Sequence, residues 1–487
     1  MSRVPSESDP FAASRFDFAA MVPATDHLGH VHFLAIGGAG MSGVARIMLA
    51  RGMPVSGSDA KAVPVLLALE REGARVWVGF DASHQASADT IVMSSSIRDD
   101  NVELVAARER GLPVLHRAQA LAALMHGHRA VAVAGANGKT TTTSMLTVAL
   151  QAGGLDPSFA VGGELAKHGT NAHHGSGEVF VAEADESDGS FIVYRPEVAI
   201  VTNVQADHLD FYLNFKVVQA AYDVFVSTIR PGGLLVTCAD DEGAVELARR
   251  ARYNGVRVFT YGFHPDADLV LSDHVDGLSS TVRLHDGAAS YRLRLAVPGR
   301  HNALNAAGAY AAAVHGLGSH PEPVLAGLAS FTGTRRRFEP KGEAAGVVVV
   351  DDYAHNAGKV TAVVETAAGL VRSTGRLVVV FQPHLFSRTR DFAEQLGVGL
   401  SPADVVLVMD VYAAREDPVP GVSGALVADA VQRARAGVEV HYVPSWGEMA
   451  GLAASLVRPG DLLLTIGAGD VTMIGPEVLR LLDEDVP

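Results

Sequence analysis

The sequence has little cysteine, no excess of positive charge and no long apolar run, and each shortage excludes a class of protein. Its one cysteine, Cys238, cannot form an internal disulfide, which excludes a disulfide-stabilised secreted scaffold. The net charge of −15 argues against nucleic acid or an anionic membrane as a partner, but it is compatible with an anionic small molecule. No apolar stretch approaches the roughly 20 residues that span a bilayer. These shortages predict a cytoplasmic protein without membrane insertion.

The remaining composition is that of a globular chain with several domains. Its 487 residues are 48% hydrophobic and 19% charged, which predicts about two to four domains, each with its own core. Residues 1–26 lack the basic start and the apolar block of a secretory signal, and we predict a disordered tail there. No internal repeat is evident. The motifs described below divide the rest of the chain into domains at 27–125, 126–333 and 334–487.

The stretch VAVAGANGKTTTTSMLTVAL, residues 131–150, predicts a nucleotide phosphate site. Its first four residues are typical of a buried strand, Gly135 to Gly138 interrupt the pattern, and a helix is expected from Lys139. Free backbone N–H groups of the first helical turn, the lysine charge and a threonine hydroxyl can together hold a phosphate and its Mg²⁺. Because Val133 occupies the place of the first glycine of the usual phosphate loop, an ordinary strand–turn–helix connection remains an alternative.

An earlier glycine motif predicts a second phosphate site, this time for a ribose diphosphate. Gly38, Gly40 and Gly43 follow an expected strand and open a helix, and the next strand ends at Asp59, which is placed to meet a ribose hydroxyl. The motif does not distinguish NAD from a UDP-sugar. Alternatively, the glycines only allow strand and helix to pack closely. The polar segment SSSIRDDN, at residues 94–101, is either a ligand edge or a surface loop.

Acidic residues follow two strands that come after the phosphate loop. The strand at 179–182 is followed by Glu183, Asp185, Glu186 and Asp188, and the strand at 198–202 by Asn203, Asp207 and His208. Hard oxygen ligands of this kind suit Mg²⁺. Such clusters are also common in solvated loops, but their place beside Lys139 favours a metal and phosphate site. Further on, His301 and Asn305 lie four apart on one helix face and could read a purine edge.

The last domain is predicted to be a doubly wound parallel sheet, because its strands are continuously apolar and alternate with helices. The expected strands are Val347–Val350, Leu377–Phe381, Val405–Met409, Val438–Val443 and Leu462–Ile466. Ligands of such sheets lie beyond the carboxyl ends of the strands. The polar residues expected there are Asp351, Asp352, Tyr353, His355, His384, Arg388 and Asp470. The predicted fold is thus α/β, with a Rossmann-like first domain, a central domain of the P-loop ATPase type and a Rossmann-like, doubly wound third domain.

Taken together, these motifs resemble those of the Mur ligases, and most closely those of the alanine-adding member. The matching stretches are AIGGAGMSG, VSGSD, AGANGKTTTTSML, EADESDGSF, TNVQADHLD, GRHNALNAAGA, GTRRRFEPKG, DDYAHN and FQPHLFSRTRDF. They occur in the family order and cover essentially the whole chain after residue 27.

The resemblance implies an ATP-dependent ligase that joins the carboxylate of UDP-N-acetylmuramate to L-alanine through an acyl phosphate, in peptidoglycan precursor synthesis. The implied cofactors are ATP and Mg²⁺, or Mn²⁺ in its place. The implied partners are small-molecule substrates without nucleic acid, and the implied state is a monomer or homodimer.

The resemblance also implies roles for particular residues. The catalytic residues would be Lys139, Glu183, His208 and Arg337, and the metal ligands Thr140, Glu183 and His208. ATP would meet Gly135, Ala136, Asn137, Gly138, Lys139, Thr140, Thr141, His301, Asn305, Arg337 and Asp352. The UDP-sugar would meet Gly38, Ala39, Gly40, Met41, Ser42, Gly43, Asp59 and Ser95. The amino acid would meet Tyr353, His355, His384 and Arg388.

The chain departs from the family pattern in two places. Ala136 and Asn137 replace the usual residues of the phosphate loop, and Asn356 and Ala357 replace a His-Pro pair beside the expected amino-acid pocket. No lysine matches the one that some Mur ligases carbamylate, and Lys216 is a poor candidate. Three alternatives stay open. The departures leave room for a related ligase that adds another amino acid or a peptide to the same UDP-sugar, and for a ligand-binding regulator without catalysis. The first glycine motif leaves room for a nicotinamide-dependent oxidoreductase, although the phosphate loop and the acidic strand ends argue against it.

Overall fold

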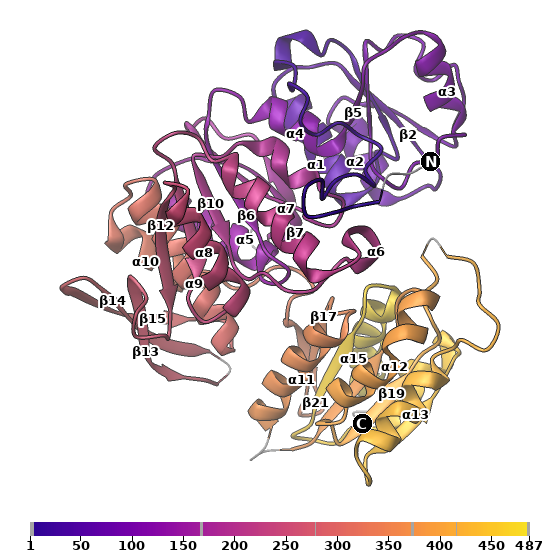
Figure 1. The fold of residues 1–487 in the computed structure, drawn as a ribbon. Helices are drawn as coiled ribbons and strands as arrows, with labels where there is room; N and C mark the ends of the chain where they lie inside the picture. The colour runs from indigo at the N-terminus through magenta and orange to yellow at the C-terminus, as the bar shows by residue number, and fades with distance from the viewer. Residues whose placement is uncertain (1–3, 166–168, 278, 372–374, 415, 485–487) are drawn as a thin grey trace. The chain divides into compact units, whose positions relative to one another are not determined.

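The computed structural model describes residues 4–165, 169–277, 279–371, 375–414 and 416–484, and the chain divides into two compact units. The first unit is Met1–Thr332 and the second is Gly333–Pro487. The first unit contains two β-sheets and the second contains one (Figure 1). The α/β class and the succession of three sheet-containing domains are as predicted.

The first sheet is parallel and has the strand order β3-β2-β1-β4-β5. Its strands are β1 (Val31–Leu34), β2 (Val55–Asp59), β3 (Arg75–Val78), β4 (Thr90–Met93) and β5 (Val114–His116). Its helices are α1 (Ala39–Ala50), α2 (Pro64–Arg71), α3 (Val102–Glu109) and α4 (Arg117–Leu124). The strand order reverses at β1, and ligands of doubly wound sheets bind at such a point. The predicted glycine motif opens α1 directly after this strand.

The second sheet has ten strands in the order β15-β14-β13-β12-β11-β10-β6-β9-β7-β8. Its strands are β6 (Arg129–Ala134), β7 (Ser158–Leu165), β8 (Thr170–His173), β9 (Val179–Glu183), β10 (Val198–Val201), β11 (Leu234–Cys238), β12 (Arg257–Gly262), β13 (Leu269–Val275), β14 (Ser280–Asp286) and β15 (Ala289–Leu295). The three strands β9, β6 and β10 are neighbours and run parallel. Their carboxyl ends therefore meet at one edge, where the phosphate loop leaves β6.

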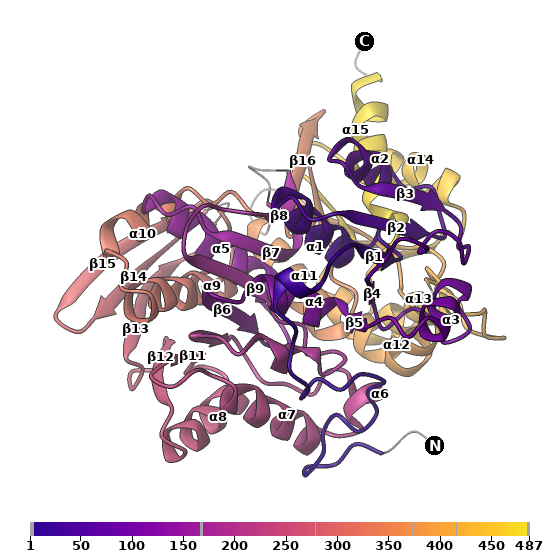
Figure 2. The ribbon, with the colours of Figure 1, turned by 90° about the horizontal axis from the view of Figure 1, so that it is seen from above.

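Helices cover both faces of the second sheet (Figure 2). They are α5 (Lys139–Ala152), α6 (Leu209–Tyr212), α7 (Phe215–Ser227), α8 (Glu242–Tyr253), α9 (Arg300–Ala311) and α10 (Pro321–Ala329), with short helical segments at Ser190–Tyr194 and Ala312–Gly316. Side chains of a strand alternate between faces. Val131 and Val133 thus join the core with α5 and α9, whereas Ala130 and Ala132 join the core with α7 and the first domain.

The third sheet has the order β16-β17-β21-β18-β19-β20 and is parallel except for β16. Its strands are β16 (Glu339–Ala344), β17 (Val347–Asp352), β18 (Leu377–Phe381), β19 (Val405–Val408), β20 (Glu439–Tyr442) and β21 (Leu462–Ile466). Its helices are α11 (Ala357–Val371), α12 (Phe386–Leu400), α13 (Ala425–Ala434), α14 (Trp446–Leu456) and α15 (Ile474–Glu484), with a short turn at Asp470–Met473. Separate apolar clusters pack on its two faces. The predicted doubly wound sheet is confirmed, and β16 is an added antiparallel edge.

The prediction of a disordered tail is wrong for residues 4–26. Phe18 is only 5% exposed, and Phe11 and Phe16 pack against the same apolar core. The Thr25 hydroxyl also donates to the Ala123 carbonyl of α4 at 2.9 Å. Composition alone misleads here, because three phenylalanines spaced along a polar segment supply enough apolar surface to dock it. Residues 1–3 lie outside the described part of the chain.

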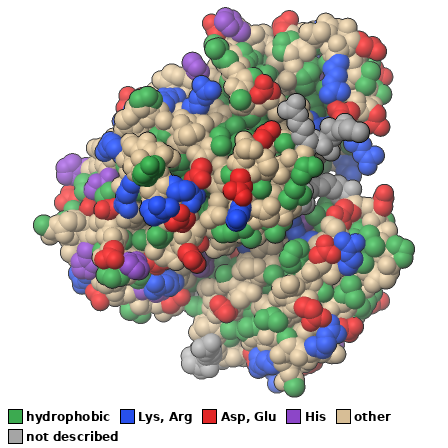
Figure 3. Space-filling view, viewed as in Figure 1, with side chains coloured by type: hydrophobic (Ala, Val, Ile, Leu, Met, Phe, Trp, Pro, Cys, Tyr) green, Lys and Arg blue, Asp and Glu red, His purple; other side chains and the backbone are tan. Residues whose placement is uncertain are grey.

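Among the residues that the structure describes, no helix combines the length and apolarity needed to cross a bilayer. On the face drawn in Figure 3, acidic and basic side chains are interspersed and form no broad field of a single sign.

Replacing a docked phenylalanine tests whether the N-terminal segment is ordered. We expect Phe18→Ala to lower the free energy of unfolding of the first unit by about 3 kcal/mol, because a buried ring is lost. Met21→Ala is the matched control, since Met21 is 92% exposed. The measurement is the midpoint of thermal unfolding. Equal midpoints for both variants and the unaltered protein would contradict the docked segment.

Candidate active site

The phosphate loop between β6 and α5 requires glycine at its two ends. Gly135 and Gly138 have φ of 131° and 87°, a region that favours glycine. A side chain at Gly135 would collide with the Thr202 hydroxyl, and one at Gly138 would lie 2.5 Å from Asn305 Oδ1. Between them, Ala136 is buried. The backbone conformation and the neighbouring side chains therefore both favour glycine at positions 135 and 138.

The peptide of Asn137 is held in place by the end of β10. Its N–H donates to Asn203 Oδ1 at 2.9 Å, and its carbonyl accepts from Asn203 Nδ2 at 2.9 Å and from the Thr202 hydroxyl at 2.6 Å. The Asn137 side chain donates to Gln205 Oε1 at 3.0 Å. Sequence reasoning placed Asn203 at this strand end but missed its role as a brace for the loop.

Lys139 carries the positive charge of the site. Its Nζ donates to the Gly135 carbonyl at 2.7 Å and lies 2.9 and 2.8 Å from the two carboxylate oxygens of Glu186. Burial lowers the pKa of the Lys139 ammonium, but the nearby carboxylates of Glu186 and Asp185 outweigh it, so the pKa lies above its ordinary value. The lysine is therefore charged at neutral pH and is paired with Glu186.

The predicted metal ligands are only partly brought together. The Thr140 hydroxyl donates to Glu183 Oε1 at 3.0 Å, and the other Glu183 oxygen accepts from the Gly162 N–H at 2.6 Å. His208, in a left-handed conformation with φ of 53°, has its Nε2 3.6 Å from Glu186 instead. Hydroxyl and carboxylate oxygens are ligands that fit Mg²⁺, which retains waters. Over the described residues, no group of three His, Cys, Asp or Glu side chains is arranged to hold a metal.

The residues expected to meet adenine lie beside the loop on α9. Asn305 is buried, and its Oδ1 accepts from the Thr142 hydroxyl at 3.2 Å. His301, one turn earlier, is exposed. Thr141 is partly exposed on the first turn of α5. Asn305 therefore supports the loop, and His301 is the more accessible of the predicted pair.

The glycine motif of the first domain lies against the second domain. The turn after β1 has its left-handed residue at Ala35, with φ of 64°, and Gly38 caps α1. A side chain at Gly40 would lie 2.5 Å from Arg117 Nη1, and one at Gly43 would lie 3.2 Å from Ala172 of β8. The Ala39 carbonyl accepts from Asn171 Nδ2 at 2.7 Å, and Met41 and Ser42 are buried. Close packing therefore explains both glycines: Gly40 faces Arg117 of α4 within the same domain, and Gly43 faces β8 of the second domain.

Asp59 stands at the end of β2 beside this turn. Its carboxylate accepts from the Gly37 N–H at 2.9 Å and from the Lys61 N–H at 3.2 Å. The aspartate therefore fixes the glycine turn, and it remains the predicted partner of a ribose.

Arg117, which the sequence analysis did not assign to the site, supplies positive charge beside the glycine turn. Its Nη1 approaches Gly40, and its Nη2 lies 3.6 Å from the Asp185 carboxylate. The arginine follows β5, so the rule that ligands bind at the carboxyl ends of strands could have identified it.

Ser95 takes part in a three-residue contact between the domains. Its hydroxyl donates to Asp188 Oδ2 at 2.5 Å, and His116 Nε2 lies 3.2 Å from Ser95 Oγ and 3.3 Å from Asp188. His116 Nδ1 accepts from the Ala118 N–H, so Nε2 carries the proton. Burial would raise the pKa of Asp188, but the hydrogen bonds from His116, Ser190 and Ser95 outweigh it and hold the pKa well below its usual range.

In the second unit, Arg337 lies just before β16, and Asp352 is the last residue of β17. The Asp352 carboxylate accepts from the Phe338 N–H at 2.8 Å and the Ala354 N–H at 2.7 Å, and burial raises its pKa. The Arg337 guanidinium lies 5.4 Å from the centre of the Tyr353 ring. The neighbouring Arg336 has partners within the second unit. It pairs with Asp351 and donates to the Gly467 carbonyl at 2.6 Å.

The predicted amino-acid residues form a continuous cluster. Tyr353 and His355 have ring centres 5.2 Å apart, His355 and His384 5.5 Å, and His384 Nδ1 lies 3.5 Å from Arg388 Nη1. Burial lowers the pKa of His355 to about 3, so its ring is neutral. Tyr412, stacked on His384 at 6.0 Å, is an additional member that the sequence analysis missed. Tyr412 follows β19, and no sequence motif marked the end of that strand as part of the site.

The departure at Asn356 has a local explanation. Its side-chain oxygen accepts from the Lys359 N–H at 2.9 Å, and its carbonyl accepts from the Val360 N–H at 2.9 Å. Asn356 therefore caps the first turn of α11, a position where asparagine is favoured.

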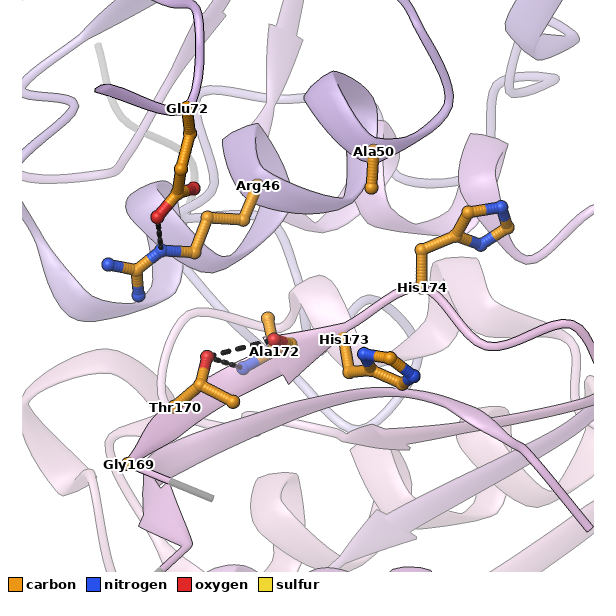
Figure 4. Close-up of a pocket in the computed structure, with 8 residues that line it drawn as sticks. All are labelled: Arg46, Ala50, Glu72, Gly169, Thr170, Ala172, His173 and His174. Carbon is orange, nitrogen blue, oxygen red and sulfur yellow. Dashed lines mark hydrogen bonds and ion pairs between the residues drawn. The ribbon is translucent and has the colours of Figure 1, made fainter. Parts of the chain in front are cut away.

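A separate cleft of about 320 Å³ lies between α1 and β8 (Figure 4). Its lining residues are Arg46, Ala50, Glu72, Gly169, Thr170, Ala172, His173 and His174. Arg46 and Glu72 pair at one end at 3.2 Å, and the two histidines lie at the other. His173 pairs with Asp156 at 3.2 Å. Because these charges already have partners, we assign no ligand to this cleft.

Three sequence models of one family match successive parts of the chain. Residues 30–129 match the Mur ligase family catalytic domain, residues 133–313 the Mur ligase middle domain and residues 336–469 the Mur ligase glutamate ligase domain. The chain belongs to the Mur ligase family.

Relatives within the Mur ligase family are similar over nearly the whole chain. A protein of Kineococcus radiotolerans named UDP-N-acetylmuramate–L-alanine ligase is 57% identical over 96% of this chain and 98% of its own length. One of the same name from Paenarthrobacter aurescens is 52% identical over 95% of this chain and 99% of its own length. A crystal structure of UDP-N-acetylmuramate-alanine ligase from Thermotoga maritima matches with a TM-score of 0.78 at 28% identity, covering 94% of this chain and all of that one.

The brace from β10 to the phosphate loop can be tested by replacing Asn203. We expect Asn203→Ala to weaken ATP–Mg²⁺ binding about tenfold to thirtyfold, because hydrogen bonds that fix the loop are lost. Gln205→Ala is the control, since Gln205 contacts the Asn137 side chain and Asp241 but not the backbone of the loop. Titration calorimetry measures both. An Asn203→Ala protein that binds ATP like the unaltered protein would show that the loop holds its shape without the brace.

Proposed function

We propose that this chain is an ATP-dependent ligase that joins the carboxylate of UDP-N-acetylmuramate to the amine of L-alanine, with ADP and phosphate as the other products. The observation that carries the proposal is the phosphate loop between two strand ends that bear Glu183 and Asn203, in a chain similar over its full length to ligases of that name.

In this proposal the loop binds the phosphates of ATP. Its backbone N–H groups and Lys139 hold the β- and γ-phosphates, and Lys139 exchanges the carboxylate of Glu186 for phosphate oxygens as ATP enters. Mg²⁺ would be held by Thr140 and Glu183, with His208 as a further ligand, and supplies charge neutralisation on the transferring phosphoryl group. Arg337 would add positive charge at the ATP phosphates.

The UDP-sugar is assigned to the turn that opens α1. The diphosphate would lie over Gly38 to Gly43, near Arg117, with Asp59 at the ribose and Ser95 at the sugar. In the first step the substrate carboxylate attacks the γ-phosphorus and ADP leaves, which gives an acyl phosphate. Charge that develops on the transferred group is stabilised by fixed donors, and such stabilisation is usually the largest catalytic contribution.

In the second step the amine of alanine attacks the acyl carbon, and phosphate leaves from a tetrahedral intermediate. Arg388 would bind the alanine carboxylate. His355 Nδ1 lies 3.0 Å from the Tyr353 carbonyl, which can only accept, so Nε2 retains a free lone pair. A neutral His355 can therefore accept a hydrogen bond from the amine, and His384 and Tyr412 would limit the size of its side chain.

We further infer that the protein acts in the cytoplasm, as a monomer or homodimer, on these small molecules alone. Water must be excluded from an acyl phosphate during turnover.

Removing the loop lysine tests the proposed reaction. We expect Lys139→Ala to lower kcat by about 10²–10³-fold, because a fixed charge at the transferred phosphoryl group is lost. Lys216→Ala, on the exposed surface of α7, is the control and should retain full activity. Phosphate release from ATP, UDP-N-acetylmuramate and L-alanine is the measurement, with the thermal midpoint as a check on folding. Full activity of a folded Lys139→Ala protein would contradict the proposal.

A further inference from the structure

Residues 11–18, which we call the strap, contact both domains of the first unit. Phe11 packs on Phe191 of the second domain, with ring centres 6.4 Å apart. Phe16 and Phe18 pack on His116 of the first domain at 4.8 and 5.3 Å. The strap is drawn in indigo in Figures 1 and 2. It therefore lies over the joint that Ser95, His116 and Asp188 form.

Arg15 of the strap binds the backbone of the loop that carries Ser95. Its Nη2 donates to the Ile97 carbonyl at 2.7 Å and to the Ser95 carbonyl at 3.3 Å, and its Nη1 lies 3.3 Å from the Asp99 carboxylate. The planar guanidinium fork presents several donors in fixed directions, and this geometry suits neighbouring acceptors. One side chain thus contacts the loop at three positions, Ser95, Ile97 and Asp99.

The loop depends on such outside support because it has no regular secondary structure. Residues 94–101 lie between β4 and α3, and the hydrogen bonds within their own backbone are those of Ile97 to Ser94 and of Asn101 to Arg98. Ser95 is therefore held from two directions, by Asp188 at its hydroxyl and by Arg15 at its carbonyl. A binding group that is already fixed before the ligand arrives loses less conformational entropy when the ligand binds.

We propose that Arg15 is a positioning residue for the UDP-sugar, holding the Ser95 loop in its binding shape through the carbonyls of Ser95 and Ile97. The inference rests on the proposed function, because that function assigns the loop to UDP-N-acetylmuramate. Arg15 itself touches no reacting group.

The test compares three variants in titration calorimetry with UDP-N-acetylmuramate and, separately, with ATP–Mg²⁺. Arg15→Ala is expected to bind the UDP-sugar about tenfold more weakly and ATP unchanged. Arg15→Lys should show the same loss, because an ammonium near Asp99 keeps the charge but not the fork. Arg108→Ala is the matched control: it removes the other arginine paired with Asp99, at 2.9 Å, and should change UDP-sugar binding less than about twofold.

Three results would overturn the inference: unaltered UDP-sugar binding by Arg15→Ala, full recovery by Arg15→Lys, or equal losses of UDP-sugar and ATP binding with a lowered thermal midpoint. The last would make Arg15 a merely structural residue. Binding is read without turnover, so the two proposals fail differently. An unaltered protein that binds the UDP-sugar but ligates no alanine contradicts the proposed function and leaves Arg15 testable, whereas one that does not bind the UDP-sugar contradicts both.

Discussion

The placement of the phosphate loop between two polar strand ends is the constraint on which the rest of the site depends. Because β6 runs parallel between β9 and β10, the phosphate loop lies at the same edge of the sheet as Glu183 and Asn203. Partly buried charges are costly unless they are paired. Each charge here has a protein partner, with Lys139 on Glu186 and Asp188 on His116. In the proposed reaction, a phosphate that binds here would replace Glu186 as the partner of Lys139.

One short acidic stretch after β9 connects the two proposed ligand sites of the first unit. Glu183 and Glu186 contact the phosphate loop, whereas Asp185 faces Arg117 and Asp188 holds Ser95. Contacts to both sites from residues so close in sequence suit a reaction in which a γ-phosphate must meet the carboxylate of a sugar. The strap contacts the same joint, so the loop proposed to bind the UDP-sugar is held by residues distant in sequence.

Local patterns predicted most of the fold. Continuous apolar runs located β17, β18, β19 and β21, and the glycine motifs located the starts of α1 and α5, because these patterns depend only on residues close together in the sequence. The same reasoning grouped Tyr353, His355, His384 and Arg388 at one sheet edge, where their side chains do meet. Contacts between distant segments were not predictable. Ser95 and Asp188 are 93 positions apart, and the docking of Phe18 depends on a surface that only the folded domain creates.

The identity of the ligation product shows which amino acid the protein adds to the UDP-sugar. The protein would be incubated with ATP, Mg²⁺, UDP-N-acetylmuramate and an equimolar mixture of amino acids, and the UDP-linked products would be identified by mass spectrometry. The account predicts one ATP-dependent product, UDP-N-acetylmuramate extended by a single alanine. A product extended by a different amino acid, or no extended product at all from folded protein, would contradict it.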